Sequence, residues 1–294
     1  MKIRFVGSGA FGLPTLRALA DRHEIVQVLT QPDKPAGRGK KLTPTPIGQW
    51  CDDHGLPIVR TMSINSEPMV DADVLVVIAF GQKVGPDVTD APRLGAVNLH
   101  ASLLPRWRGA APIHHAIMAG DTVTGNSVIR LAERMDAGAV LGQSERPIED
   151  THTTGDLHDL LAEDGVELML DVLDELESGT AEEIEQDETL ATPAGKLSRA
   201  DAVLDFTQDA KIVSRKINGL SPWPGVRVNI AGESVTLLRS RPAAGTGTPG
   251  TILDNGHIAC GTGAIEVLEL QPSGKKPMPL DAYRNGRDWS GTVT

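Results

Sequence analysis

The sequence predicts an α/β protein of two domains, a parallel sheet covered by helices followed by a small β-barrel. Through the first half of the chain, short apolar and β-branched runs alternate with helical segments, which is the pattern of a parallel sheet. After Asp205, short strand-like runs follow one another between glycine-rich turns. Between these two parts, residues 180–202 lose regular periodicity. We therefore expect domains at 1–187 and 205–294, joined by a linker at 188–204.

The first domain is expected to alternate strands and helices in order. The expected strands are 2–7, 24–30, 56–59, 73–79, 96–100 and 126–131, and the expected helices begin near Gly12, span 46–55, begin at Pro112 and span 154–178. The last helix has apolar residues at helical spacing, an acidic outer face and a stop signal at Gly179. Ligands bind beyond the carboxyl ends of strands in such sheets, so we expect the site after residues 73–79 and 96–100.

The second domain is expected to begin with a helix at 210–220 and a turn at SPWPG. Short strands should follow at 226–230, 234–240, 250–254, 257–263 and 264–271. Their short spacing, without intervening helices, predicts a small barrel or sandwich.

Charge is segregated along this chain of 294 residues, whose net charge is −11. Residues 145–190 hold 17 acidic side chains and one basic side chain. Basic side chains gather in two clusters: Lys34, Arg38, Lys40 and Lys41 in the loop 32–46, and Lys275, Lys276, Arg284 and Arg287 near the end. On charge alone, these clusters fit a solvated surface and a polyanion-binding surface equally well. The loop contains several prolines and glycines and should be extended rather than helical.

Membrane insertion and export are not expected. No run approaches 18 apolar residues, and the chain enters a strand without the order of a signal peptide. Cys51 and Cys260 match no metal or redox spacing, so we expect two inert, buried thiols in a reduced, cytoplasmic protein.

The opening GSGAFG spells a dinucleotide-binding pattern with Gly7, Gly9 and Gly12. Such a site also needs an acidic residue at the end of the second strand, but this strand ends in Thr30. The pattern therefore fits a strand-to-helix turn that needs small residues better than an NAD(P) site.

The run AVNLH carries the most informative polar residues. Asn98 and His100 are two apart on a strand, so both side chains project from one face at its carboxyl end. An amide donor and a titratable donor suit the stabilisation of an oxyanion. Asp136, in the turn MDAG, is the leading candidate to pair with His100. A histidine that only satisfies backbone groups in a loop remains the alternative.

Two other types of site are disfavoured at this position. No G-x-S-x-G elbow surrounds Ser102, which argues against a serine nucleophile. Asparagine is a poor zinc ligand, and no second histidine stands at metal spacing from His100.

The run NLHASLLPRWRGAAPI, followed by MDAG, resembles the signature of the 10-formyltetrahydrofolate-dependent formyltransferases. The runs QPDKPAGRGKKLTPTP, VVIAFGQ, GKLSRADAVLDF, INGLSPWPG and GKKPMPLDAYRNG extend the resemblance over nearly the whole chain. It implies a Rossmann-like catalytic domain and an OB-like C-terminal barrel. The family commonly has proline and alanine where this chain has Gly9 and Gly12, so the dinucleotide pattern arises from these two glycines.

The resemblance also implies a reaction, in which the formyl group of 10-formyltetrahydrofolate is transferred to the amino group of an initiator methionyl-tRNA. Asn98 and a protonated His100 would stabilise the formyl oxygen, and Asp136 would keep His100 charged. The folate would contact Ile78, Ala79, Phe80, Gly81, Gln82, Ser102, Leu103, Leu104 and Pro105. The tRNA would contact Lys34, Arg38, Lys40, Lys41, Lys275 and Lys276. No metal, NAD(P) or membrane is implied, and we expect a monomer.

The sequence departs from the family pattern at His114 and at residues 82–85, which bears on substrate and folate contacts. A formyltransferase acting on a sugar or other small amine is the nearest alternative. A nicotinamide-dependent oxidoreductase and a non-catalytic RNA-binding module are the alternatives from other classes.

Overall fold

The computed structural model describes the whole chain except Gly37, Arg38 and Lys40, so two of the cations expected in the loop 32–46 lie outside the described residues. The chain forms two units. The N-terminal unit contains residues 1–109, 125–146 and 158–193, and the C-terminal unit contains residues 110–124, 147–157 and 194–294. The limits 1–187 and 205–294 remain predictions of where the functional domains divide.

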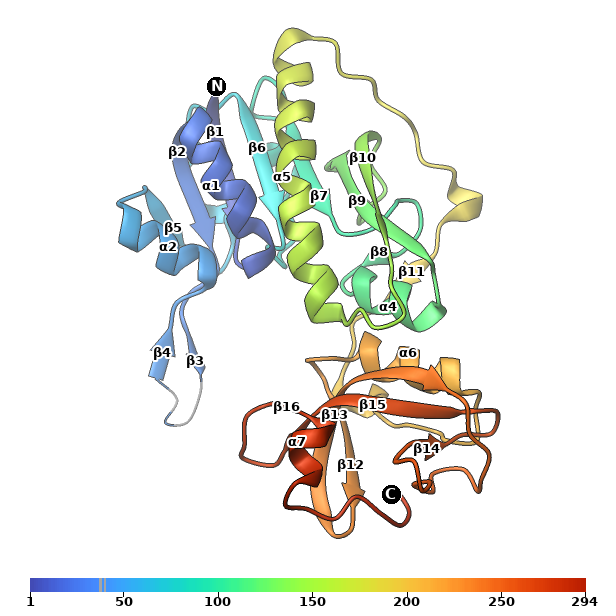
Figure 1. The fold of residues 1–294 in the computed structure, drawn as a ribbon. Coiled ribbons are helices and arrows are strands. Elements are labelled where there is room, and N and C mark those ends of the chain that lie inside the picture. Colours follow the sequence, from blue (N-terminus) through green and yellow to red (C-terminus); the bar gives the residue numbers. More distant parts are fainter. Residues whose placement is uncertain (37–38, 40) are drawn as a thin grey trace. The chain divides into compact units, whose positions relative to one another are not determined.

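The N-terminal unit is built on a seven-stranded sheet with the order β10-β9-β7-β6-β1-β2-β5 (Figure 1). Its strands are β1 (Lys2–Gly7), β2 (Glu24–Thr30), β5 (Ile58–Arg60), β6 (Val74–Ile78), β7 (Ala96–His100), β9 (Val123–Arg130) and β10 (Val140–Pro147). Strands β5, β2, β1, β6 and β7 are parallel, as predicted. The prediction of a further parallel strand near 126–131 was wrong, because β9 runs antiparallel to β7. An apolar run reports burial and not strand direction.

The helices before residue 180 also lie close to the predicted positions. They are α1 (Leu13–Arg22), α2 (Pro46–His54), α3 (Pro86–Thr89), α4 (Pro112–Ala119) and α5 (Thr154–Ser178), of which α4 belongs to the C-terminal unit. Single 3-10 turns lie at Ala10–Gly12, Ile64–Ser66 and Glu188–Leu190, and a fourth, at Arg199–Asp201, belongs to the C-terminal unit. The short strands β3 (Lys34–Ala36) and β4 (Lys41–Thr43) pair as an antiparallel hairpin, and β8 is Arg108–Gly109 and β11 is Pro193–Ala194.

The glycines of the opening motif have a packing role. A Cβ atom on Gly7 would lie 2.7 Å from the carbonyl oxygen of Ile78, and one on Gly12 would lie 3.1 Å from the Cβ of Ile78. Real Cβ atoms do not approach backbone that closely, so the turn after β1 needs glycine at position 7 to pass the end of β6. This is the small-residue turn that the sequence favoured.

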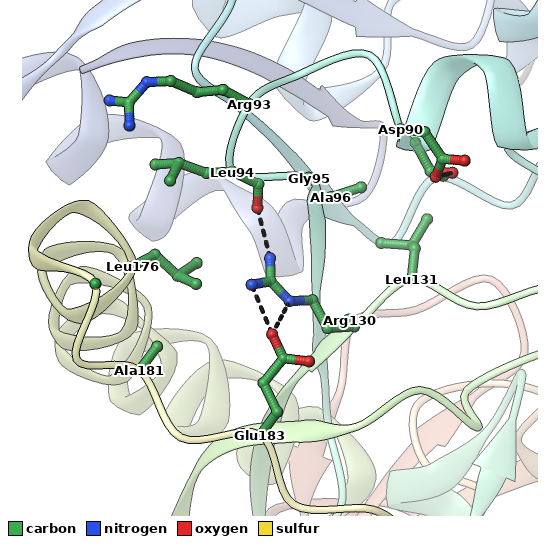
Figure 2. Close-up of a pocket in the computed structure, with 12 residues that line it drawn as sticks. Asp90, Arg93, Leu94, Gly95, Ala96, Arg130, Leu131, Leu176, Ala181 and Glu183 are labelled. Carbon is green, nitrogen blue, oxygen red and sulfur yellow. Dashed lines mark hydrogen bonds and ion pairs between the residues drawn. The ribbon is translucent and has the colours of Figure 1, made fainter.

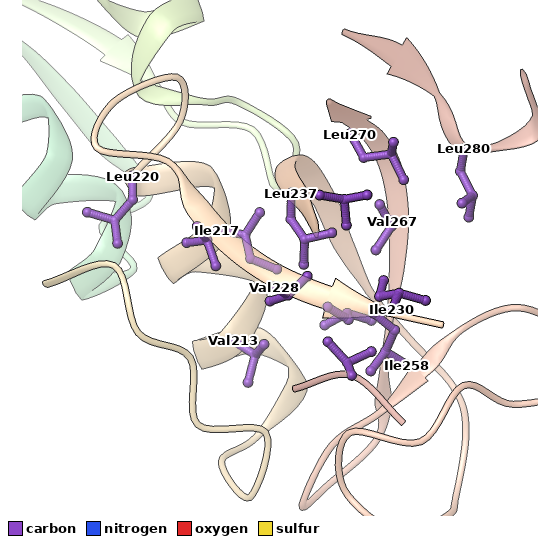
Figure 3. Packing of buried hydrophobic residues seen from close by; sticks show 14 of the residues in the cluster. Val213, Ile217, Leu220, Val228, Ile230, Leu237, Ile258, Val267, Leu270 and Leu280 are labelled. Carbon is purple, nitrogen blue, oxygen red and sulfur yellow. The ribbon is translucent and has the colours of Figure 1, made fainter. Parts of the chain in front are cut away.

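The C-terminal unit contains a five-stranded antiparallel sheet, and strands in this part of the chain were predicted. Its elements are α6 (Ala210–Gly219), β12 (Val226–Ile230), β13 (Glu233–Ala243), β14 (Ile258–Ala259), β15 (Ala264–Pro272), β16 (Met278–Pro279) and α7 (Leu280–Arg284). Figure 3 shows its core, in which Val213 and Ile217 of α6 pack with aliphatic side chains of the strands, among them Val228 and Leu237. The strand expected at 250–254 was wrong, because only isolated bridges form at Thr251 and Ile252.

Both cysteines are buried and unpaired, as predicted. Burial raises the pKa of each thiol to about 11, so neither is a thiolate near neutral pH. In the described part of the chain, no helix has the length and apolar character needed to cross a membrane.

Candidate active site

Asn98 is the middle residue and His100 the last residue of the central strand β7, which lies between β6 and β9. His100 is only 7% exposed, whereas Asn98 is half-buried. Among the described residues, no group forms a hydrogen bond with the side-chain amide of Asn98. An amide that stands at the carboxyl end of a buried strand without a protein partner keeps its donors free for a ligand.

The two ring nitrogens of His100 face different oxygen atoms. Nε2 lies 2.9 Å from the carbonyl oxygen of Trp107. Because a carbonyl only accepts, Nε2 carries a hydrogen and donates it. Nδ1 lies 3.8 Å from Oδ2 of Asp136, beyond hydrogen-bond distance but within ion-pair distance. Nδ1 is therefore the ring nitrogen that can still exchange a proton with a ligand.

Asp136 lies in a turn whose backbone is held in an uncommon conformation. Its φ angle is +53°, in the left-handed region that non-glycine residues rarely occupy. Its Oδ2 accepts a hydrogen bond of 2.9 Å from the backbone N–H of Gly109. Trp107, which receives the His100 hydrogen bond, also has a positive φ of +65°. Such residues are held by their surroundings and gather at functional sites.

The structure thus brings together the predicted catalytic residues Asn98, His100 and Asp136 on neighbouring parts of the N-terminal unit. A buried imidazole beside a carboxylate, next to an uncommitted amide, can donate hydrogen bonds to an oxygen that gains negative charge and can move a proton.

The end of β6 and the loop that follows it carry the first five residues predicted to contact folate. Ala79 and Gly81 are exposed and both have positive φ angles, while Ile78 and Phe80 are buried. The carbonyl oxygen of Phe80 accepts a 2.6 Å hydrogen bond from Gln31.

Gln82 ties the same loop to residues 61–64. Its carboxamide accepts from the backbone N–H of Ile64 at 3.1 Å and donates to the carbonyl of Thr61 at 3.0 Å. The departure from the family pattern at Gln82 is therefore an anchor of the loop. Its neighbours in the loop remain the groups available to a ligand.

The loop that follows β7 carries the other four predicted folate residues, Ser102, Leu103, Leu104 and Pro105. Ser102 is fully buried and donates to the carbonyl of Arg106 at 2.7 Å, so its hydroxyl serves the loop itself. Leu104 is buried, whereas Leu103 and Pro105 are partly exposed. A ligand at this edge would meet these last two.

The predicted tRNA-binding lysines that the structure describes are all exposed. Lys34 and Lys41 lie on the β3–β4 hairpin, and Lys275 and Lys276 lie in the turn between β15 and β16. Lys34 donates to Gln31 at 2.6 Å. Of the other C-terminal cations, Arg287 pairs with Glu233 at 3.1 Å.

A cavity of about 440 Å³ lies away from these residues (Figure 2). Its lining includes Ala96, the first residue of β7. His100 is the last residue of the same strand, and four residues of extended strand separate the two by about 13 Å. Arg130 in this cavity is engaged by the carbonyl of Leu94 and the carboxylate of Glu183. The cavity therefore belongs to the other end of the sheet and not to the candidate site.

Known protein families match both parts of the chain. A family model described as formyl transferase matches residues 1–173, and one described as formyl transferase, C-terminal domain, matches residues 196–288. A methionyl-tRNA formyltransferase of Paracoccus denitrificans (strain Pd 1222) is 46% identical over 297 residues, covering 97% of both chains.

Solved structures share the fold at lower identity. WlaRD, a sugar 3N-formyltransferase, aligns with a TM-score of 0.73 over 94% of this chain and 99% of its own, at 14% identity. HypX from Aquifex aeolicus, in complex with tetrahydrofolic acid, aligns with a TM-score of 0.64 over 96% of this chain and 46% of its own, at 20% identity.

Proposed function

This chain belongs to the formyl transferase family, and from that premise we propose that it transfers the formyl group of 10-formyltetrahydrofolate to the α-amino group of an initiator methionyl-tRNA. The observation that carries the proposal is the 46% identity, over 97% of both chains, with a methionyl-tRNA formyltransferase. The product is N-formylmethionyl-tRNA for translation initiation in the cytoplasm, and the enzyme acts as a monomer.

The reaction needs charge stabilisation more than it needs a strong base. A free α-amino group has a pKa of about 7.7 to 8.0, and esterification of the neighbouring carboxyl group to the tRNA lowers this pKa, so a substantial share of the amine is neutral near pH 7. The neutral nitrogen attacks the formyl carbon, a C–N bond forms and the formyl oxygen becomes negative. The bond from that carbon to N10 of the folate then breaks, tetrahydrofolate leaves with a proton, and the amine loses one.

The candidate site supplies the groups that this sequence of steps requires. The uncommitted amide of Asn98 donates to the negative formyl oxygen, and protonated Nδ1 of His100 donates beside it. Asp136, 3.8 Å from Nδ1, balances the positive charge of the imidazole. The same carboxylate receives the proton of the attacking amine, directly or through water.

The co-substrate is assigned to the two loops at the carboxyl ends of β6 and β7. The exposed residues Ala79 and Gly81 and the partly exposed Leu103 and Pro105 are its contacts. The formyl group keeps its oxidation state, so the transfer uses no NAD(P). Asn98 and His100 take the role that a metal would have in charge stabilisation.

The tRNA is assigned to exposed cations in each unit. Lys34 and Lys41 on the β3–β4 hairpin, and Lys275 and Lys276 after β15, contact backbone phosphates. Arg38 and Lys40 join them by their place in the sequence, although they lie outside the described residues.

The test is an assay of the purified protein with 10-formyltetrahydrofolate and two acceptors, charged initiator methionyl-tRNA and a nucleotide-linked amino sugar. We expect formylation of the tRNA, detected by acid electrophoresis of the aminoacyl-tRNA. Transfer to the amino sugar alone would replace the proposal with the sugar-amine reaction. No transfer to either acceptor would refute both.

A further inference from the structure

The segment after α5 is more than a linker. Residues 181–193 belong to the N-terminal unit, and Ile184 exchanges two backbone hydrogen bonds with Val140, at 2.8 and 2.9 Å. Further along, the carbonyl of Thr192 accepts from the N–H of Arg108 at 2.9 Å, and its hydroxyl accepts from the N–H of Trp107 at 2.9 Å. The segment, which we call the strap, thus runs along the loops that carry the candidate catalytic residues.

Gln186 is partly buried, and the residues of the strap immediately on both sides of it are exposed. Its NH₂ group donates to the carbonyl oxygen of Asp136 at 2.9 Å and to that of Gly138 at 2.7 Å. Its carbonyl oxygen accepts from Nε and Nη2 of Arg108 at 2.9 and 2.7 Å. A carboxamide has two N–H donors and two lone pairs on oxygen, so every one of them is used.

The partners of Gln186 fix the orientation of its amide. Backbone carbonyls only accept and a guanidinium only donates, so a flipped amide would place donor against donor and acceptor against acceptor. A glutamate at this position could still accept from Arg108. It would, however, place a carboxylate against two carbonyl oxygens.

The two carbonyls held by Gln186 belong to Asp136 and to Gly138, two residues further along the same turn. Asp136 has the left-handed φ described above, and no Cβ fits on Gly138, where it would lie 1.9 Å from the carbonyl oxygen of Arg130. Arg108, held by the same carboxamide, is followed by Gly109, whose N–H donates to Oδ2 of Asp136. One side chain therefore joins the backbone of Asp136 to the strand that binds its carboxylate.

We propose that Gln186 is a positioning residue for formyl transfer, which holds Asp136 at its place beside His100. This inference rests on the proposed catalytic role of Asp136. Groups that orient a catalytic side chain typically change activity by about 10- to 100-fold when they are removed. They do so because a carboxylate that moves by about 1 Å no longer meets the proton that it must balance or accept.

The strap also supplies a matched control. Glu188 pairs with Arg108 at 3.0 Å and with Arg134 at 2.9 Å, and it is half exposed. It ties the strap to the same region by charge, but within the described part of the chain it forms no hydrogen bond or ion pair with Asp136 or Gly138. If the strap acts only as a structural brace, Glu188 and Gln186 should be equivalent.

The experiment compares Gln186→Leu, Gln186→Glu and Glu188→Gln by steady-state kinetics and thermal melting. We expect Gln186→Leu and Gln186→Glu to lower kcat by about 10-fold or more, with KM for both substrates within about twofold. Glu188→Gln should keep kcat within about twofold. Normal kcat in both Gln186 variants, or an equal loss of kcat in Glu188→Gln, would overturn the proposal.

A double-mutant cycle separates positioning from general damage. In the Asp136→Ala background, Gln186→Leu should change kcat by less than about twofold, because the group that it positions is gone. Full additivity would show that Gln186 acts elsewhere and would overturn the inference. If Asp136→Ala itself kept a normal kcat, the proposed role of Asp136 would fail. If Asp136→Ala lowered kcat but Gln186→Leu did not, only the inference about Gln186 would fail.

Discussion

Two aspartates, one in each unit, are held in opposite ways. Asp156 stands in the first turn of α5 and accepts from the N–H and hydroxyl of Thr153, at 2.8 Å each, and from both Nη atoms of Arg239, at 2.6 and 3.0 Å. The carboxylate of Asp136 accepts one hydrogen bond, from Gly109, among the residues that the structure describes, and its Oδ2 lies 3.8 Å from Nδ1 of His100. The first carboxylate is satisfied by the fold, whereas the second keeps capacity for a ligand.

The difference teaches how a carboxylate that serves the fold can be told apart from one that is open to a ligand. A carboxylate has about four lone-pair sites. When the fold fills them with a cap and a bidentate arginine, the charge stabilises the native state. Around Asp136 the fold instead fixes the backbone, through Gln186, and leaves the carboxylate oxygens open. These oxygens can still interact with a charge or a proton that appears during a reaction.

The largest expected effect concerns the open carboxylate and its partners. Asn98→Ala, His100→Ala and Asp136→Ala should each lower kcat by about 100-fold or more, and pairs of changes should cost little beyond the worse single change. Single-turnover formylation measures this, with thermal melting to show that the variants remain folded. Near-normal turnover of His100→Ala would remove this residue from the mechanism.

The second prediction concerns the satisfied carboxylate and should affect stability, not chemistry. Asp156→Asn loses the bidentate ion pair with Arg239 and weakens the cap, which should lower the free energy of unfolding by about 1–2 kcal/mol. Urea unfolding measures the loss, and kcat at 25 °C should be unchanged. A large fall in kcat in a folded Asp156→Asn would break the distinction between the two aspartates.

The pH dependence of this loss follows from the pKa of Asp156. Burial alone would raise it, but the hydrogen bonds from Arg239 and Thr153 outweigh burial and lower the pKa from 3.8 to about 2. A lowered folded-state pKa contributes stability above the unfolded pKa and loses it as pH falls through the folded value. The stability difference between wild type and Asp156→Asn should therefore be constant above about pH 4.5 and shrink between pH 4 and 2.

The sequence predicted the central strands and named three candidate catalytic residues that the structure brings together, but it did not predict what holds them. Strand β7 is an apolar run with polar residues two apart, so its burial and the convergence of Asn98 and His100 follow from alternation. Gln186 binds carbonyls some 50 residues earlier in the chain, in a segment without periodicity, so no local pattern reports it. The direction of β9 and the β3–β4 hairpin likewise depend on pairing between segments, which a single run of residues does not encode.

The comparison between the two aspartates can be extended to exposed cations, whose charges are open to a ligand in the same way as the carboxylate of Asp136. The double variant Lys275→Ala/Lys276→Ala should raise KM for charged tRNA about fivefold at low salt and reduce the salt dependence of binding, with kcat and KM for folate unchanged. Lys211→Ala, an exposed cation of the same unit on α6, is the matched control. Equal salt slopes for the wild type and the double variant would remove these lysines from tRNA recognition and favour a small-amine acceptor.

The smallest expected effect is at Lys34, an exposed cation that is also linked by hydrogen bonds to the predicted folate loop. Its exposed Nζ donates to Gln31, and Gln31 donates to the carbonyl of Phe80 in the predicted folate loop. An exposed hydrogen bond contributes little, so Lys34→Ala should raise KM for tRNA by about twofold through the lost charge and leave KM for folate unchanged. Gln31→Ala removes the link to the loop itself and should raise KM for folate more than KM for tRNA. Lys34→Ala could instead raise KM for folate as much as Gln31→Ala does. In that case the β3–β4 hairpin would act through the folate loop, and Lys34 would help to organise the folate site and would not bind tRNA phosphates.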